Sequence, residues 1–238
     1  MKFSHLTRIY TNQSITQDQT LKITNEFHYL KSVIRLKKGH IFRIFNHFQG
    51  EFLANIANIG KKDITVVIQS QTRTITLEKE LTLAMCIIKP DRMNEAIKSA
   101  VQMGVTNIIP IISDRTQYKK ISYDKLMRTI IQSIEQSERF CPPQLMDIMT
   151  LKELCCTLDL PQIIFSSEST DLDNHIMKIK EIDNKVAVLI GPEGGFSETE
   201  NQMLEQYNHI SPISLGNTVL RSETAAIAAL ACIQMVRT

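Results

Sequence analysis

The sequence lacks the features of a membrane-spanning or secreted protein. Its longest apolar stretch, Ala225 to Ile233, is far shorter than the roughly 20 residues that a transmembrane helix needs. The first residues, MKFSHLTRIYTNQS, contain no apolar core of the kind that a secretory signal requires. We therefore expect a cytoplasmic protein that does not cross a membrane.

The spacings of a metal-binding protein are also missing. The five cysteines form no C-x-x-C pair, and adjacent Cys155 and Cys156 have no second pair with which to make a zinc site. The six histidines are scattered and include no H-E-x-x-H pattern. We expect reduced thiols and no metal.

Charge is divided unevenly along the chain. Residues 1–72 hold ten Lys and Arg against four Asp and Glu, whereas the remaining residues hold 17 against 21. A basic part joined to a mildly acidic part indicates a division of labour in which the basic part meets a polyanion. Chance alone can also produce such a difference, because a few surface charges decide it.

The first third of the chain has the pattern of a small β-barrel. Turn signals separate its β-rich runs, which are Phe3–Tyr10, His40–His47, Gly50–Ile59 and Asp63–Ser70. A helix capped by Asn25 is predicted between the first two runs, because Phe27, Leu30, Val33 and Ile34 follow at helical spacing. The polar stretch Gln69–Glu80 is the predicted linker, and we divide the domains at residues 1–72 and 73–238.

From Leu81 onward, strands that are apolar throughout alternate with helices, as in a parallel sheet covered on both faces. The predicted strands are Leu83–Ile88, Asn107–Ile112, Gln162–Phe165, Val186–Ile190 and Ile210–Leu215. The predicted helices are Arg92–Met103, Tyr123–Arg139, Leu172–Glu181, one from Ser197 and one from Glu223. Ligands of such α/β sheets bind beyond the carboxyl ends of the strands. The loops after Ile190 and Leu215 are therefore the candidate sites.

The first of these loops is Gly191-Pro-Glu-Gly-Gly-Phe196, followed by a capping box of Ser197 and Glu200. It is neither a P-loop nor a G-x-G-x-x-G fingerprint, and Glu193 at its centre would repel a phosphate. A ligand with a neutral or positive centre, such as a sulfonium, fits better. An ordinary strand-to-helix turn explains the same residues equally well.

The second loop is Leu215-Gly-Asn-Thr-Val-Leu-Arg-Ser-Glu-Thr-Ala225, which opens an alanine-rich last helix. So many alanines allow another backbone to approach closely, although helix propensity alone also explains them.

Together, Ile190-Gly-Pro-Glu-Gly-Gly-Phe196, Leu215-Gly216 and Leu220-Arg-Ser-Glu-Thr-Ala225 resemble the SPOUT class of methyltransferases. More narrowly, the chain resembles the ribosomal RNA small-subunit methyltransferase E family, which methylates N3 of a uridine in 16S ribosomal RNA. Looser likenesses cover nearly the whole chain, at Phe27-His-Tyr-Leu30, Val33-Ile-Arg35, Lys89 with Arg92-Met93, Gly104-Val105, Asp114-Arg-Thr116 and Glu135-Gln-Ser137. Two positions depart from the family pattern, Gln102 in place of Glu and Glu138 in place of Gly.

The resemblance implies an α/β fold with a SPOUT-type knotted parallel-sheet catalytic domain behind an N-terminal PUA-like β-barrel. It also implies S-adenosyl-L-methionine as cofactor, a homodimer, and the small ribosomal subunit or its RNA as partner. Combined with strand-end geometry, it predicts cofactor contacts, with Phe165–Glu168 closing a third side of the site. These residues are Phe165, Ser166, Leu189, Gly191, Pro192, Glu193, Gly194, Gly195, Leu215, Gly216, Val219, Leu220, Thr224 and Ala225.

For the chemistry we predict Arg221 and Glu223, because a guanidinium can donate a fork of hydrogen bonds to the uracil oxygens as N3 loses its proton. An alternative is that Arg221 pairs with Glu193 or Glu223 and only braces the loops. RNA contacts are predicted at Arg8, Lys31, Arg35, Lys37, Lys38, Lys89, Arg92 and Arg115. An alternative for Arg35 is that it forms a structural ion pair. Two other functions stay open, a non-catalytic RNA-binding assembly factor and a Rossmann-like nucleotide enzyme.

Overall fold

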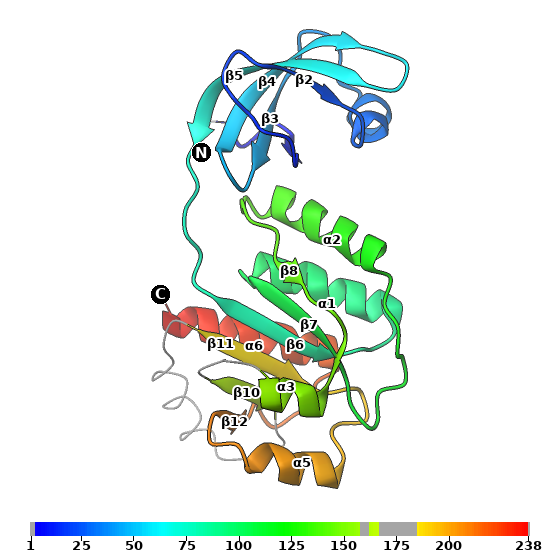
Figure 1. The fold of residues 1–238 in the computed structure, drawn as a ribbon, viewed down its shortest axis with the longest axis vertical. Helices are drawn as coiled ribbons and strands as arrows, with labels where there is room; N and C mark the ends of the chain where they lie inside the picture. Colours follow the sequence, from blue (N-terminus) through cyan, green and yellow to red (C-terminus); the bar gives the residue numbers. More distant parts are fainter. Residues whose placement is uncertain (1–2, 158–161, 167–184, 238) are drawn as a thin grey trace. The chain divides into compact units, whose positions relative to one another are not determined.

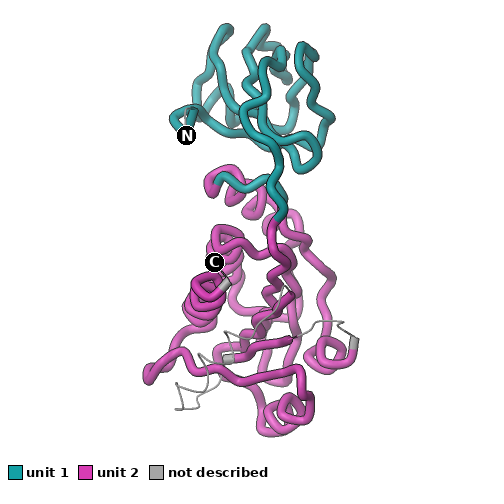
Figure 2. Tube along the Cα trace, turned by 90° about the vertical axis from the view of Figure 1, so that its left-hand side faces the viewer, with its two compact units in different colours: residues 1–77, 138–141 teal, residues 78–137, 142–238 magenta. Residues whose placement is uncertain are grey.

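The computed structural model of the protein describes residues 3–157, 162–166 and 185–237. It divides into two compact units (Figure 2), unit 1 with residues 1–77 and 138–141 and unit 2 with residues 78–137 and 142–238. The expected domain boundary, between residues 72 and 73, lies near the end of the last strand of unit 1. Among the described residues, no helix is long and apolar enough to cross a bilayer.

Unit 1 is built on a five-stranded sheet in the order β1-β3-β4-β5-β2 (Figure 1). The strands are β1 (Arg8–Tyr10), β2 (Thr20–Ile23), β3 (Ile41–Asn46), β4 (Gly50–Ile59) and β5 (Ile64–Arg73). Strand β1 runs parallel to β3, and the other neighbours are antiparallel. Pairings among the described residues place β1 and β2 at the two ends of this order. Apolar side chains from all five strands form one core.

Three local features of unit 1 differ from the sequence prediction. Strand β1 begins only at Arg8, and β5 continues to Arg73, so the first part of the predicted linker is strand. The helix predicted after Asn25 is present at residues 27–33, but its larger part is the π-helical turn η1 (Tyr29–Val33). Arg35 follows with a left-handed φ of 59°, which ends any helix there.

Unit 2 contains a seven-stranded sheet in the order β12-β10-β11-β6-β7-β8, in which β9 also pairs with β7. The strands are β6 (Leu81–Cys86), β7 (Asn107–Ile112), β8 (Gln144–Leu145), β9 (Met149–Thr150), β10 (Ile163–Ser166), β11 (Val186–Ile190) and β12 (Ile210–Ile213). Every pairing is parallel, as the continuous apolar runs predicted. The sheet therefore presents all its carboxyl ends along one edge.

Helices cover both faces of this sheet (Figure 1). The helices are α1 (Pro90–Gln102), α2 (Tyr123–Gln136), α3 (Leu151–Thr157), α5 (Glu198–Glu205) and α6 (Ser222–Arg237). On one face, α1 packs against both α2 and α6. On the other face, residues of α3 and α5 pack onto alternate residues of β6, β7, β10 and β11. The predicted helix Leu172–Glu181 lies outside the described residues, and the knot stays a prediction.

Candidate functional site

Three strands of unit 2 end side by side at the predicted site. Strand β10 lies between β11 and β12, with Phe165 in register with Leu189 on one side and Pro212 on the other. The loops that follow β11 and β12 therefore leave the sheet on the two sides of the end of β10. This register brings together the three segments that the sequence predicted to surround the cofactor, except for residues 167 and 168, which lie outside the described residues.

The glycines of the two loops are required for different reasons. Gly195 and Gly216 have left-handed φ angles of 67° and 115°, which favour glycine, and a Cβ at either position would meet no atom within 4 Å. A Cβ on Gly191 would lie 3.2 Å from the Phe196 ring, so this glycine is needed for packing. A Cβ on Gly194 would make only ordinary contact, 3.7 Å from Cδ of Arg115. The open space at Gly195 and Gly216 is where a ligand could approach the backbone.

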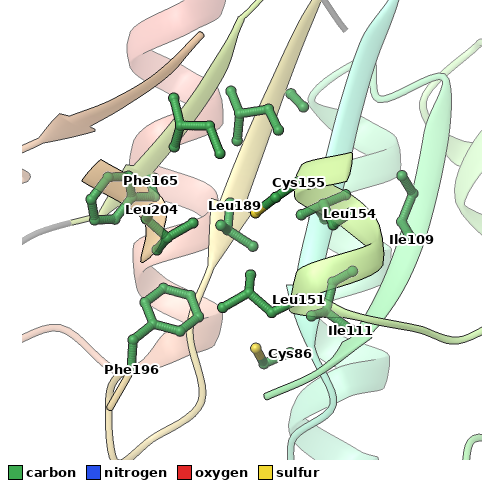
Figure 3. Packing of buried hydrophobic residues seen from close by; sticks show 14 residues of the cluster. Cys86, Ile109, Ile111, Leu151, Leu154, Cys155, Phe165, Leu189, Phe196 and Leu204 are labelled. Atoms are coloured by element: carbon green, nitrogen blue, oxygen red, sulfur yellow. The ribbon is translucent and has the colours of Figure 1, made fainter. Parts of the chain in front are cut away.

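Phe196 anchors the first loop in the core of unit 2 (Figure 3). Its ring packs edge-on against Phe165, with 6.5 Å between ring centroids, and Leu189 belongs to the same buried cluster. The side chains of Phe165 and Leu189, both predicted cofactor contacts, are thus buried in the core beneath the strand ends. Burial raises the pKa of the nearby Cys86 thiol to about 11, which keeps it protonated and unsuited to nucleophilic catalysis.

Hydrogen bonds among Asp114, Ser197 and Glu200 join the first loop to the segment after β7, and we call these three residues the latch. The Glu200 carboxylate accepts from the Asp114 backbone N–H at 2.8 Å, and the Ser197 hydroxyl donates to the Asp114 carboxylate at 2.6 Å. The same Ser197 and Glu200 form the predicted capping box at the start of α5, which the structure confirms. The box is a local pattern in the sequence, whereas Asp114, which bonds to both of its members, is more than 80 residues away and could not be predicted.

Arg115, predicted as an RNA contact, lies against the same loop. Its Nη1 donates a hydrogen bond to the Gly194 carbonyl oxygen at 2.9 Å, and its exposed side chain crosses the glycine. The guanidinium therefore fixes the direction of one peptide group in the predicted cofactor loop. The remaining donors of the guanidinium can still serve a second partner.

The two residues predicted for the chemistry have contrasting surroundings. Glu223 is buried in the first turn of α6, and its carboxylate forms an ion pair of 3.0 Å with Arg92 at the start of α1. Arg221 is exposed, and no carboxylate among the described residues pairs with it. The alternative in which Arg221 is tied to Glu193 or Glu223 is therefore not what the structure contains. Arg92 supplies the brace to Glu223 instead.

The other predicted cofactor residues form the walls and rim of the two loops. Pro192 and Ala225 are buried, Leu215 and Leu220 are half-buried, and Glu193 and Thr224 are exposed. Val219 exposes 91% of its surface although it is apolar. Ser166 ends β10.

One open cavity lies near these loops, and no metal-ligand cluster does among the described residues. Within the described ranges, no three His, Cys, Asp or Glu side chains come together as metal ligands. An open cavity of about 490 Å³ lies beside them, at the end of β7, and is lined by residues of the latch and by Lys119 and Lys152. None of the predicted cofactor residues lines it.

Most of the predicted RNA contacts are exposed, but Arg8 is not. Exposed are Lys31, Arg35, Lys37, Lys38, Lys89, Arg92 and Arg115. The Arg8 side chain is only 2% exposed, lies 2.7 Å from the Glu51 carboxylate and stacks over the Phe45 ring. Burial of the guanidinium excludes direct contact with RNA and corrects the prediction for Arg8. A charged residue in a β-rich run was taken for a surface residue, because its partner is 43 positions away.

Glu138, one of the two departures from the family pattern, belongs to the same ion-pair cluster of unit 1. Its carboxylate lies 2.8 Å from Arg43 and 2.6 Å from Arg73. Its φ is 63°, the left-handed region in which glycine is favoured. The glutamate therefore occupies a glycine-like conformation and is held there by two arginines.

Comparison with known proteins places both units. The sequence of residues 76–234 matches a family model described as an RNA methyltransferase domain, and residues 24–69 match one described as an RNA methyltransferase PUA domain. The chain is 34% identical over 233 residues to ribosomal RNA small subunit methyltransferase E of Rickettsia conorii, covering 96% of this chain and 95% of that protein. Identity to the protein of the same name from Buchnera aphidicola is 31%, with the same coverage.

Solved structures share the complete fold. One, from Legionella pneumophila, is assigned as a methyltransferase and contains bound SAM; it is 29% identical, has a TM-score of 0.87 and is matched over 97% of both chains. A ribosomal RNA small subunit methyltransferase E from Neisseria gonorrhoeae, bound to S-adenosyl methionine, superposes with a TM-score of 0.85 over 98% of both chains. At 24% identity, this second likeness supports the fold alone.

Proposed function

Because the chain belongs to the ribosomal RNA small subunit methyltransferase E family, we propose that it transfers a methyl group from S-adenosylmethionine to N3 of a uridine in small-subunit ribosomal RNA. In this proposal unit 2 binds the cofactor and carries out the reaction, and unit 1 binds the RNA. The observation that carries it is the register of β10, β11 and β12, which brings the two family-specific loops together at one edge of the sheet.

The residues present fit S-adenosylmethionine, whose sulfonium carries an electrophilic methyl group. Gly195 and Gly216 leave space against the backbone, as close approach of a ligand requires. Glu193 is exposed at the centre of the first loop, where a carboxylate favours a positive ligand over a phosphate. The latch from Asp114 and the anchor at Phe196 hold this loop in one conformation, so little ordering is left for the binding step.

Arg221 is our candidate for the residue closest to the chemistry. Loss of the N3 proton places negative charge on the two flanking carbonyl oxygens of uracil, and a guanidinium can donate to both. The exposed Arg221 has no carboxylate partner among the described residues, so its donors are available. Glu223 acts as a positioning residue, because its ion pair with Arg92 fixes the start of α6 next to Arg221. Positioning and charge stabilisation can together supply the catalysis.

We further propose that the protein is a cytoplasmic homodimer that associates through the region of α6. Two apolar side chains there are largely exposed, Met235 on the helix at 80% and Val219 in the preceding loop at 91%. The Ala-rich sequence of α6 permits close packing against a partner. In sedimentation experiments, Ala228→Trp should weaken association. A wild-type protein that is active as a stable monomer would refute the dimer.

The decisive experiment has two parts. Calorimetric titration of the full-length protein with S-adenosylmethionine should give saturable binding, and mass spectrometry of ribosomal RNA from a deletion strain should reveal one uridine that has lost its methyl group. Restored methylation by the purified protein, on naked RNA or on isolated subunits, identifies the substrate form. A protein that binds RNA but neither binds the cofactor nor methylates would be a non-catalytic assembly factor.

A further inference from the structure

A row of three aromatic rings lies at one corner of unit 1, in and beside the turn between β3 and β4. The rings of His47 and Phe48 have centroids 3.8 Å apart and are tilted by 40°, and the His47 ring stacks on Tyr10 at 6.1 Å with an interplanar angle of 18°. Phe48 ends the row and is 67% exposed. We call Tyr10, His47 and Phe48 the aromatic row. Single exposed apolar residues are common on protein surfaces, but this one lies against a second ring.

The turn that carries Phe48 is rigidly built. The buried Asn46 side chain accepts hydrogen bonds from the backbone N–H groups of Phe48 at 3.0 Å and Gln49 at 2.7 Å. Its amide nitrogen donates to the Gln13 carbonyl oxygen at 2.9 Å, and the Gln49 carbonyl oxygen accepts from the Gln71 side chain at 2.7 Å. The exposed ring is therefore held on a preorganised support, which lowers the entropy that a ligand must overcome.

The His47 ring is fixed in orientation as well. The Tyr10 hydroxyl donates to the Asn12 side-chain oxygen at 2.8 Å, and it lies 2.8 Å from His47 Nδ1. Because the hydroxyl has one hydrogen, it accepts from Nδ1–H of His47. This arrangement keeps the imidazole between Tyr10 and Phe48. A neutral imidazole carries one N–H, so when the proton is on Nδ1 the Nε2 atom is a hydrogen-bond acceptor.

The polar groups around the row are amides and hydroxyls. Asn12, Gln13 and Ser14 are exposed on the segment after β1, and Gln71 is exposed on β5. Such groups can hydrogen-bond to the edge of a nucleobase or to a ribose hydroxyl, while a flat aromatic surface matches the face of the base.

We propose that the aromatic row is a stacking platform for an unpaired base of the RNA substrate, with Phe48 as the contact residue. This inference rests on the proposed function, because it requires RNA to be the ligand of unit 1. Aromatic side chains are the usual partners of splayed-out bases in single-stranded RNA, whereas a duplex hides its base faces. The platform therefore selects single-stranded or looped RNA.

The platform and the basic residues of unit 1 are separable. Lys37 and Lys38 precede β3 and the aromatic turn follows it, so the two lie at opposite ends of a six-residue strand, about 20 Å apart at roughly 3.3 Å per residue. Contacts to phosphates make affinity depend on salt, whereas stacking does not. A loss at Phe48 should therefore lower affinity equally at every salt concentration.

The test measures affinity of the full-length protein for a mixed-sequence 12-nucleotide RNA and for the duplex of the same sequence, across a salt series. Phe48→Ala should weaken binding of the single strand by about 5- to 150-fold, the range for loss of one stacked base, with an unchanged salt slope and little effect on the duplex. Phe48→Tyr keeps the ring and should restore affinity. Val33→Ala is the matched control, since Val33 is also apolar and 59% exposed in unit 1.

Three outcomes would overturn the platform. Single-strand affinity of Phe48→Ala equal to that of the wild type removes the stacking role and leaves the methyltransferase proposal intact. Loss of dimerisation in sedimentation with RNA affinity preserved makes Phe48 a contact between copies of the chain. Wild-type protein that binds no RNA at low salt contradicts both the platform and the RNA-binding role of unit 1, and only then do the two proposals fail together.

Discussion

Arg115 donates a hydrogen bond of 2.9 Å to the carbonyl oxygen of Gly194, so a residue predicted for RNA also shapes the candidate cofactor loop. Arg115→Ala should weaken S-adenosylmethionine binding by about 3- to 10-fold, corresponding to about 1 kcal/mol for an exposed hydrogen bond. Calorimetry measures this directly in the absence of RNA. Lys119→Ala, also exposed and on the same segment, is the control. Unchanged cofactor affinity in Arg115→Ala would restrict Arg115 to RNA.

Gly216 tests where the cofactor lies. Gly216→Val should abolish S-adenosylmethionine binding, because its side chain would enter the open space beside the backbone. The left-handed φ of 115° also makes this variant strained. Gly39→Val is a matched control for strain, since Gly39 has a φ of 85° with no atom within 4 Å and lies in unit 1. Normal cofactor binding by Gly216→Val would show that the site is misplaced.

Gly194 provides a gentler probe of the same site. Its φ is not left-handed, and an added Cβ would only touch Arg115 at 3.7 Å, so Gly194→Ala should fold with wild-type stability. A fall in cofactor affinity without a fall in melting temperature would place the ligand against this peptide.

Arg221 should act on the transition state. Arg221→Lys is expected to keep cofactor affinity and to lose about 100- to 1000-fold in kcat, the usual effect of removing one preorganised donor, because a point charge cannot reproduce the guanidinium fork. Single-turnover methylation and calorimetry separate the two quantities. Arg92→Lys is the comparison. Because Arg92 pairs with Glu223 at the start of α6, this variant should change both stability and cofactor affinity. A lysine variant of Arg221 with wild-type turnover would remove this residue from the chemistry.

The basic residues near η1 should control the salt dependence of RNA binding. Each phosphate contact that is lost lowers the slope of log affinity against log salt by about 0.7 to 0.9. The triple substitution of Lys31, Lys37 and Lys38 by Ala should therefore lower the slope by about 2 to 3 if each contacts one phosphate. Lys61 and Lys62, in the turn before β5, form the control pair. An unchanged slope would discard these three lysines as phosphate contacts.

The surroundings of Glu138 predict how two substitutions change the stability of the protein. Glu138→Ala removes the carboxylate from Arg43 and Arg73 but keeps the left-handed strain, whereas Glu138→Gly also relieves the strain. We expect urea unfolding to show both variants less stable than the wild type, with Gly more stable than Ala by about 1 kcal/mol. Ala more stable than Gly would mean that the backbone is not left-handed in solution.

The sequence predicted the parallel sheet of unit 2 well because its strands are self-evident apolar runs. Strands β7 and β11 match the predicted ranges residue for residue, since turn residues bound a continuous hydrophobic stretch on each side. Strand β2 and the two-residue strands β8 and β9 were missed, because segments this short depend on partners far along the chain.

The candidate site was predictable where function needs unusual residues in consecutive positions, and not where it needs distant partners. Both glycine loops stood out in the sequence, and parallel strand ends must share an edge. The ion pair of Arg92 with Glu223 and the bond from Asp114 to Glu200 join residues 86 or more positions apart, which no local pattern reveals. Arg8 shows the same limit, because it was predicted to be exposed and its buried partner Glu51 is 43 positions away.

The placement of residues 138–141 within unit 1 has a consequence for biosynthesis. Unit 1 is not a continuous segment, because about 60 residues of unit 2 are made between Leu77 and Glu138. At roughly 5 to 20 residues per second, the ribosome needs about 3 to 12 s more before the last part of unit 1 emerges. Until then Arg43 and Arg73 lack the Glu138 carboxylate, and the Arg8 and Phe45 side chains lack Phe140. Unit 1 can therefore be completed only after a large part of unit 2 has been made, and a fragment that stops at the linker would be an unfinished fold.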